Sequence, residues 1–136
     1  MTLSDEMLQQ LVGTALEVRR WAYAPYSNYL VGAALLTASG KIYDGVNVEN
    51  AVFSNTICAE RTAVVKAVSE GERSFQAIAV VTKNGGTPCG SCRQMLAEFG
   101  LDTLVIIADE SGKIHRQAAV SELLPGAFTP RDLPRA

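Results

Sequence analysis

The chain contains few of the residues that build disulfide frameworks, histidine metal sites or nucleic-acid surfaces. Among its 136 residues there are three cysteines and one histidine, and the formal net charge is −2. Three cysteines cannot all pair within one chain, and a net negative charge provides no basic field to hold a nucleic-acid backbone. These features disfavour a disulfide-stapled protein and a binder of nucleic-acid polymers.

Long apolar runs are also missing. No stretch approaches the roughly 20 consecutive apolar residues that a membrane-spanning helix needs. The first ten residues, MTLSDEMLQQ, include acidic side chains and lack the positive-then-apolar pattern of a secretion signal. We therefore expect a cytoplasmic protein with reduced thiols and no membrane partner. The length favours a single domain over residues 1–136.

The apolar pattern predicts alternating helices and strands. Ser4 is suited to cap a first helix, which should end near Ala24 because Pro25 follows. Further helices are expected at 58–70 and 88–100, with a last helical turn near 121–124, and strands at 29–37, 41–48, 75–82, 103–109 and 113–117. This order predicts a layered α/β domain around a mixed sheet of about five strands, with helices on both faces.

The three cysteines fall at the starts of two predicted helices. Cys89 and Cys92 follow Pro88 in a Pro-Cys-x-x-Cys motif, and Cys58 would begin the preceding helix. Helix N-termini carry partial positive charge and free N–H donors, which stabilise thiolates. Three thiolates leave tetrahedral zinc with one open position, which is typical of catalytic zinc. The spacing therefore predicts one catalytic zinc ion.

Cys-x-x-Cys alone is a weak signal and has other interpretations. Cys58 can be a small core residue beside an incidental pair, or the pair can be a thioredoxin-like redox site. No tryptophan precedes the pair, however, and a redox site leaves Glu60 without a role. In the Cys58-Ala59-Glu60 motif, the carboxylate can reach a water on the metal without ligating it. This motif followed by Pro-Cys-x-x-Cys is the signature of zinc deaminases.

With these motifs in place, the chain resembles the small homotetrameric cytidine deaminases over nearly its whole length. The matching blocks are AYAPYSNYLVGAAL, GVNVENAVFSNTICAERTAV, PCGSCRQ and ELLPGAF. The resemblance implies the cytidine-deaminase fold, one zinc ion per subunit, and hydrolysis of cytidine or deoxycytidine to the uracil nucleoside and ammonia. It also implies a role in pyrimidine salvage, and a homotetramer whose active sites are shared between chains.

The resemblance assigns roles to individual residues. It implies zinc ligation by Cys58, Cys89 and Cys92, proton shuttling by Glu60, and charge compensation at the thiolates by Arg61. For the substrate, it implies ribose contacts from Asn47 and Glu49 and backbone contacts to the nucleoside at Ala51 and Phe53. Phe128 is implied to stack on the pyrimidine bound by a neighbouring subunit. The family usually has phenylalanine at the position of Tyr29, whose hydroxyl therefore needs a hydrogen-bond partner. Arg93 is a weaker candidate for charge compensation and is expected to be structural.

Two further functions remain as alternatives. One is a related deaminase of the blasticidin-S type, although the NVEN block at 47–50 fits a simple nucleoside better. The other is a non-enzymatic structural zinc module, which needs a fourth ligand, and His115 is the only histidine that can supply one. We otherwise assign His115 no function. A carboxylate at Glu49 near the sugar would repel phosphate and so favour a nucleoside over a nucleotide.

Overall fold

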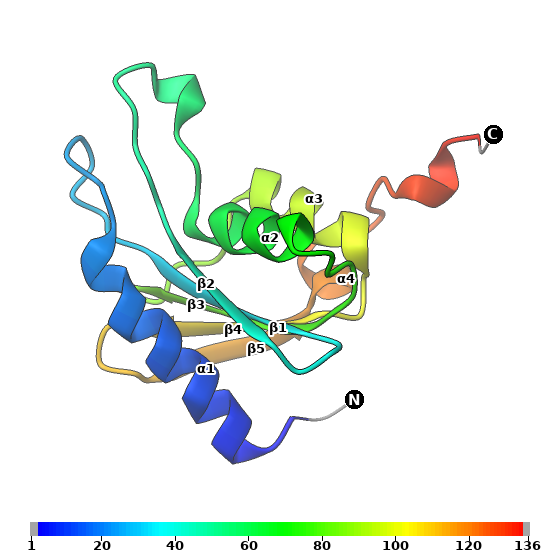
Figure 1. The fold of residues 1–136 in the computed structure, drawn as a ribbon, viewed down its shortest axis with the longest axis horizontal. Coiled ribbons are helices and arrows are strands. Elements are labelled where there is room, and N and C mark those ends of the chain that lie inside the picture. Colours follow the sequence, from blue (N-terminus) through cyan, green and yellow to red (C-terminus); the bar gives the residue numbers. More distant parts are fainter. Residues whose placement is uncertain (1–2, 135–136) are drawn as a thin grey trace.

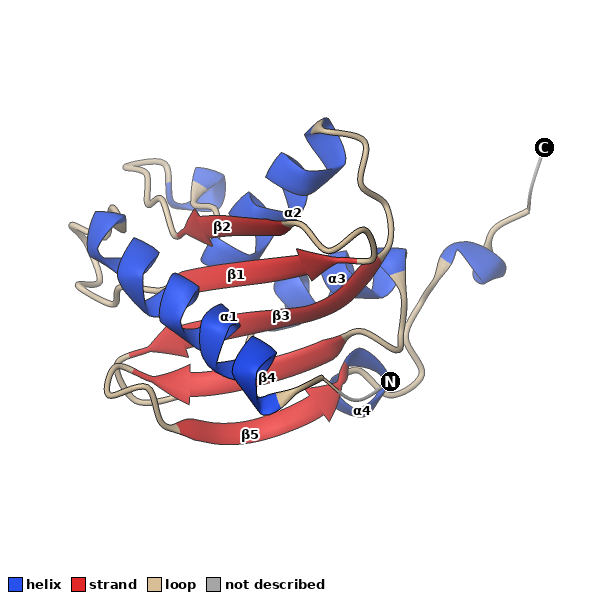
Figure 2. Ribbon diagram, turned by 60° about the horizontal axis from the view of Figure 1, so that its bottom comes forward, coloured by secondary structure: helices blue, strands red, loops and turns tan. Residues whose placement is uncertain are grey.

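A single mixed sheet forms the centre of the computed structural model, which describes residues 3–134 (Figures 1 and 2). Its strands are β1 (Gly32–Thr37), β2 (Ile42–Val46), β3 (Phe75–Thr82), β4 (Leu104–Asp109) and β5 (Ile114–Ala119). The spatial order is β2-β1-β3-β4-β5, with β3 and β4 parallel and the other neighbours antiparallel. The predicted five-stranded mixed sheet is confirmed.

Helices cover both faces of this sheet, as predicted. Helix α1 (Asp5–Val18) lies on one face, and α2 (Ala59–Ser69) and α3 (Gly90–Phe99) lie on the other (Figure 2). The short helix α4 (Val120–Leu123) follows β5 directly, and three-residue 3-10 turns occupy Arg19–Trp21, Phe53–Asn55 and Pro130–Asp132. Within residues 3–134 no helix combines the length and the apolar character needed to cross a bilayer.

Strand β3 is buried on both of its faces, which explains why its sequence is almost continuously apolar. Ile78 and Val80 belong to the hydrophobic cluster under α2 and α3, whereas Ala79 and Val81 belong to the cluster under α1. Successive side chains of a strand point to opposite faces, and both faces are covered here. The central strand therefore holds the two layers together.

The first helix begins where the sequence predicts but ends earlier. The Ser4 hydroxyl accepts a hydrogen bond from the Met7 N–H (3.1 Å), which confirms the predicted cap. The predicted end near Ala24 is wrong, because α1 stops at Val18 and a 3-10 turn carries the chain to residue 21. The cause is a long-range pairing: Tyr23 donates to the Asn47 carbonyl (3.0 Å) and its own carbonyl accepts from the residue 49 N–H (2.8 Å). Backbone groups used in this way are not available to a helix.

Candidate active site

The structure brings the three cysteines together at two helix starts. Cys58 is the N-cap of α2, Cys89 is the N-cap of α3, and Cys92 lies in the first turn of α3. Their Sγ atoms all lie within 4.8 Å of one another, with 3.8 Å between Cys58 and Cys89 and 3.4 Å between Cys89 and Cys92. None of the three forms a disulfide.

Strand β2 fixes the position of α2 through close backbone packing. A Cβ atom at Gly45 would lie 2.6 Å from the Ala63 amide nitrogen and 2.7 Å from the Ala59 carbonyl oxygen, so only glycine permits this approach. The Thr62 hydroxyl also donates to the Val46 carbonyl (3.0 Å). The first turn of α2, which follows Cys58, is therefore held rigidly against the sheet edge.

Arg93 holds the start of α3. Its guanidinium donates to the carbonyls of Pro88 (2.8 Å) and Leu123 (2.7 Å) and to the Thr87 hydroxyl (3.1 Å). These bonds tie the segment before Cys89 to the end of α4. The expectation that Arg93 is structural agrees with this geometry. Pro88 itself precedes the N-cap instead of opening the helix.

The cysteine cluster fits a zinc ion. Thiolates about 2.3 Å from a tetrahedral zinc are about 3.8 Å apart, which lies within the spread of sulfur separations here. Zinc binds the thiolate form. Interaction with the Cys92 thiol, and then with the Arg61 guanidinium, lowers the pKa of Cys58 to about 5. The pKa of Cys92 is raised, because its thiol donates to Cys58 and is buried. Cys58, Cys89 and Cys92 are thus the residues that would hold the ion.

Arg61 places a positive charge directly beside the cluster. Its Nη2 atom contacts the Cys58 Sγ atom (3.5 Å) and the Thr56 carbonyl (3.4 Å). Its Nε donor is buried and has no hydrogen-bond partner within residues 3–134. The hydrogen bond to Cys58 raises the pKa of Arg61 further, so this residue stays charged.

Glu60 lies buried in the same site. Only 4% of the residue is exposed, and burial raises the pKa of its carboxyl to about 7. It lines a pocket of about 260 Å³ together with Cys58 and Cys89. A carboxyl whose pKa is near neutral can both accept and donate a proton at physiological pH. A cation beside it would lower that pKa.

Three predicted substrate contacts line this pocket: Tyr29, Asn47 and Glu49. In the structure the side chains of Asn47 and Glu49 both hold the segment that precedes β1 in place. Asn47 donates through Nδ2 to the Tyr29 carbonyl (2.8 Å) and accepts at Oδ1 from the Val31 N–H (2.9 Å). These bonds explain why β1 begins at residue 32 and not at the predicted residue 29.

Glu49 accepts hydrogen bonds from the N–H groups of Tyr26 (2.9 Å) and Ser27 (3.2 Å) and from the Ser27 hydroxyl. The Ser27 hydroxyl, more than the backbone donors, lowers the pKa of Glu49, so its carboxylate is charged at neutral pH.

The other three predicted contacts lie outside the pocket of their own chain. Ala51 is exposed, and the Phe53 ring is exposed and packs edge-on against Tyr26, with ring centroids 5.5 Å apart. Phe128 is 55% exposed, and its carbonyl accepts a hydrogen bond from the Gln94 side chain (2.7 Å).

Sequence reasoning missed half of the pocket wall. The additional lining residues are Ser27, Val31, Thr56, Val80, Thr82, Gly86 and Thr87. Two of them carried a usable signal, because Thr87 directly precedes the Pro-Cys-x-x-Cys motif and Gly86 belongs to a glycine pair at the end of a predicted strand. Ser27, Val31 and Thr56 lie within the blocks that match the family but have no distinctive local motif, and Val80 and Thr82 carried no signal. The Tyr29 hydroxyl is expected to need a hydrogen-bond partner. The structure supplies Asn84, whose Oδ1 atom accepts the hydrogen bond at 2.7 Å.

His115 lies outside the metal cluster. Its Nε2 atom pairs with the Asp109 carboxylate at 2.6 Å, and the only potential metal-binding group within residues 3–134 is the cysteine trio. The structural zinc module therefore lacks the fourth ligand that it needs.

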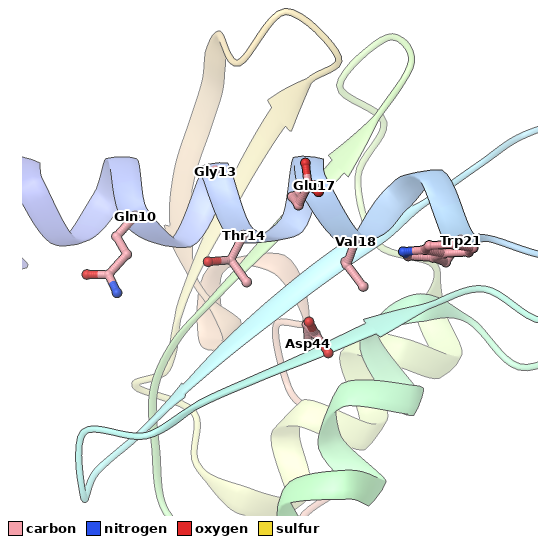
Figure 3. Close-up of a pocket in the computed structure, with 7 residues that line it drawn as sticks. All are labelled: Gln10, Gly13, Thr14, Glu17, Val18, Trp21 and Asp44. Atoms are coloured by element: carbon pink, nitrogen blue, oxygen red, sulfur yellow. The ribbon is translucent and has the colours of Figure 1, made fainter.

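A larger groove of about 450 Å³ lies elsewhere on the molecule. Figure 3 shows its lining residues: Gln10, Gly13, Thr14, Glu17, Val18, Trp21 and Asp44. Both carboxylates already have partners, because Glu17 pairs with Arg20 (3.0 Å) and Asp44 pairs with Lys66 (2.7 Å). The groove contains none of the predicted site residues, so the smaller pocket beside the cysteines is the candidate active site.

Comparison with known proteins places this site in a family context. Residues 5–108 match the model of the cytidine and deoxycytidylate deaminase zinc-binding region. A cytidine deaminase of Halalkalibacterium halodurans is 51% identical over 92% of this chain and 96% of its own length. One from Sporosarcina psychrophila is 48% identical over 93% of this chain and 94% of its own length.

Solved structures agree with these relatives. The crystal structure of cytidine deaminase from Burkholderia pseudomallei superimposes with a TM-score of 0.84 at 43% identity, covering 93% of this chain and 100% of that one. The enzyme from Mycobacterium tuberculosis gives a TM-score of 0.80 at 36% identity, covering 93% and 98%. On the combined evidence of the family model, the relatives and the fold, the chain belongs to the cytidine and deoxycytidylate deaminase family.

Proposed function

We propose that the chain is a zinc-dependent cytidine deaminase that hydrolyses cytidine and deoxycytidine to uridine and deoxyuridine with release of ammonia. The observation that carries this proposal is one buried carboxylate, Glu60, in a pocket that also contains two of three clustered cysteines. The relatives that match nearly the whole chain are named cytidine deaminases, which supports the same reaction. Residues 1–136 would form a single catalytic domain that holds one zinc ion.

The residues in and beside the pocket would have distinct roles in the reaction. When bound, zinc supplies Lewis-acid activation of a water molecule near neutral pH. Glu60 accepts a proton from the attacking water, delivers it to ring N3 of the cytosine, and then assists the departure of ammonia from C4. Arg61 offsets the negative charge of the thiolates through its contact with Cys58. The fixed start of α2 keeps Glu60 in position throughout, because Gly45 allows α2 to pack directly on β2.

The pocket favours a nucleoside over a nucleotide. Glu49 is a charged carboxylate at the pocket wall and would repel a phosphate group, while it can accept a hydrogen bond from a sugar hydroxyl. The Asn47 side chain uses one N–H donor and one lone pair of Oδ1 in hydrogen bonds to the backbone. One N–H donor and one acceptor lone pair remain for a ribose. Both residues therefore support recognition of an unphosphorylated sugar.

The assembly would be a homotetramer in the cytoplasm, acting in pyrimidine salvage. The exposed Phe128 ring, which lies outside its own chain's pocket, supports a contribution to a neighbouring site. The segment after α4 leads away from the sheet in both views, where it can reach another chain (Figures 1 and 2). Three free thiols beside one another suit a reducing compartment.

The direct test is to incubate the purified chain with cytidine and to follow uridine and ammonia. We expect stoichiometric formation of both products, loss of turnover with a strong zinc chelator, and recovery on addition of zinc. Deoxycytidine should also react, and cytidine monophosphate should react poorly. A chain that carries zinc and leaves cytidine unchanged would refute the proposal, and efficient turnover of the monophosphate would refute the nucleoside preference.

A further inference from the structure

The segment that joins β3 to α3, residues 83–88, forms one wall of the pocket through Gly86 and Thr87. It also leads directly into Cys89. The segment contains two successive glycines, and Gly85 has a left-handed φ of +74°. A glycine pair gives a segment little intrinsic rigidity, so side-chain contacts must define where this wall lies.

A hydrogen-bond network connects this segment to Tyr29, which lies beside it in the pocket wall. The Tyr29 hydroxyl donates to Asn84 Oδ1 (2.7 Å), and the Thr82 hydroxyl also contacts that oxygen (3.5 Å). The Thr82 hydroxyl in turn accepts from the Gly86 N–H (2.8 Å). Tyr29 and Gly86 both line the pocket, so the network joins two neighbouring parts of its wall.

The Tyr29 hydroxyl also packs directly against Gly86. A Cβ atom added at residue 86 would lie 2.6 Å from this hydroxyl oxygen, which is too close for an unshifted contact. The next nearest atoms, Asn84 Oδ1 and Thr82 Oγ1, would lie at 3.6 and 3.8 Å, which are ordinary contacts. Among the described residues, the hydroxyl is therefore the only group that excludes a methyl group at residue 86.

We propose that Tyr29 and Asn84 are a positioning pair that clamps residues 83–88 and fixes the position of this wall of the nucleoside pocket. The inference rests on the proposed deaminase function for its kinetic readout. The clamp acts on the wall that contacts substrate and not on Glu60, which α2 positions separately. Loss of the clamp should therefore weaken substrate binding in the ground state and the transition state alike, which raises KM and leaves kcat unchanged.

The first experiment is a double-mutant cycle on purified, zinc-loaded enzyme with cytidine as substrate. We expect Tyr29→Phe and Asn84→Ala each to raise KM about three- to fivefold, as is typical for one hydrogen bond, with kcat within about twofold. The combined variant should be no worse than either single variant, because both remove the same interaction. Asn84→Asp keeps an acceptor oxygen for the hydroxyl and should keep KM near the parental value.

A matched control is Tyr23→Phe, since the exposed Tyr23 side chain makes no hydrogen bond within residues 3–134 and lies outside the pocket. It should leave KM unchanged. Additive effects of the two single variants, or a fall in kcat at constant KM, would overturn the clamp.

The second experiment uses the steric match and does not depend on catalysis. Gly86→Ala should lower the thermal unfolding midpoint, because its methyl group meets the Tyr29 hydroxyl. Adding Tyr29→Phe removes the clash and should restore most of the midpoint of the Gly86→Ala chain. Zinc content should stay constant in every variant. If Gly86→Ala is harmless, or if Tyr29→Phe does not rescue it, the proposed match is wrong. Failure of the parental chain to deaminate cytidine would refute the proposed function and leave this stability test intact.

Discussion

Cys58 and Cys89 occupy equivalent positions on two different helices: each is the residue directly before the first helical residue, and their Sγ atoms lie 3.8 Å apart. Helix α2, strand β3 and their connecting loops separate the two positions along the chain. An ion held by both sulfurs would join the starts of α2 and α3 across that connection. Metal binding would then contribute to folding free energy as well as to chemistry.

Cys89→Ser should show how much zinc binding contributes to stability. Cys89 is exposed, so its replacement removes little packing. We expect zinc content to fall at least about tenfold and the thermal unfolding midpoint to drop, since one of three protein ligands is lost. The parental chain treated with chelator should unfold near the temperature of the variant, and chelator should not lower the variant further. A variant that retains one zinc ion per chain would contradict the assigned ligand set.

Glu60→Gln would remove the proposed proton shuttle while keeping the size of the side chain. We expect kcat for cytidine to fall by about 10²- to 10⁴-fold with zinc content unchanged, because only proton transfer is lost. Glu6→Gln on the exposed face of α1 is the matched control and should behave as the parental chain. Steady-state kinetics with measured zinc content decide the matter, and activity within tenfold of the parental value would assign the shuttle to another group.

The two arginines near the cysteines should give opposite phenotypes. Arg61 contacts a thiol, so Arg61→Ala should lower kcat about tenfold with a small effect on stability, since the charge beside the ligands is removed. Arg93 holds three acceptors around the start of α3, so Arg93→Ala should lower stability by about 2 kcal/mol. Denaturant unfolding and kinetics of both variants test this contrast. Equal effects on both readouts would contradict it.

Local signals explain what the sequence predicted, and long-range contacts explain what it did not. The Ser4 cap, the covered strand β3 and the Cys-x-Glu and Pro-Cys-x-x-Cys motifs each depend on residues within a few positions of one another. The early end of α1 depends on pairing between Tyr23 and residues 47–49, which no local pattern encodes. The same reason hides Asn84, whose partner Tyr29 lies 55 positions away.

Asp109 should contribute stability that depends on pH. Hydrogen bonds from His115, and then from the Ser111 hydroxyl, lower the pKa of its carboxyl. A lowered pKa in the folded state means that the contribution is complete above the unfolded value of about 4 and is lost as pH falls below it. We therefore expect Asp109→Asn to lower the unfolding midpoint at pH 7 and to flatten its decline below about pH 4. Asp102→Asn, at an exposed position, is the control and should keep the parental decline. An equally steep decline in the Asp109→Asn chain would contradict the prediction.

Shared active sites would require Phe128 to act on a neighbouring chain. The Phe128 side chain is exposed and lies outside the pocket that contains Glu60 of the same chain. Light scattering should give about four times the 14.5 kDa chain mass for the proposed homotetramer. Phe128→Ala should raise KM for cytidine about tenfold, because an aromatic contact with the base is lost.

Mixing variants provides the decisive measurement. When Glu60→Ala and Phe128→Ala chains are reassembled together in equal amounts, about one quarter of the sites should combine an intact Glu60 with an intact Phe128 from a neighbour. At low cytidine concentration, activity should therefore rise above the sum of the separate samples, toward one quarter of the parental rate. The control replaces the Glu60→Ala chain with the double variant Glu60→Ala/Phe128→Ala, in which no chain supplies Phe128, and should show no recovery. A fully active monomer, or mixed tetramers whose activity equals that of the control, would show that each chain builds its site alone.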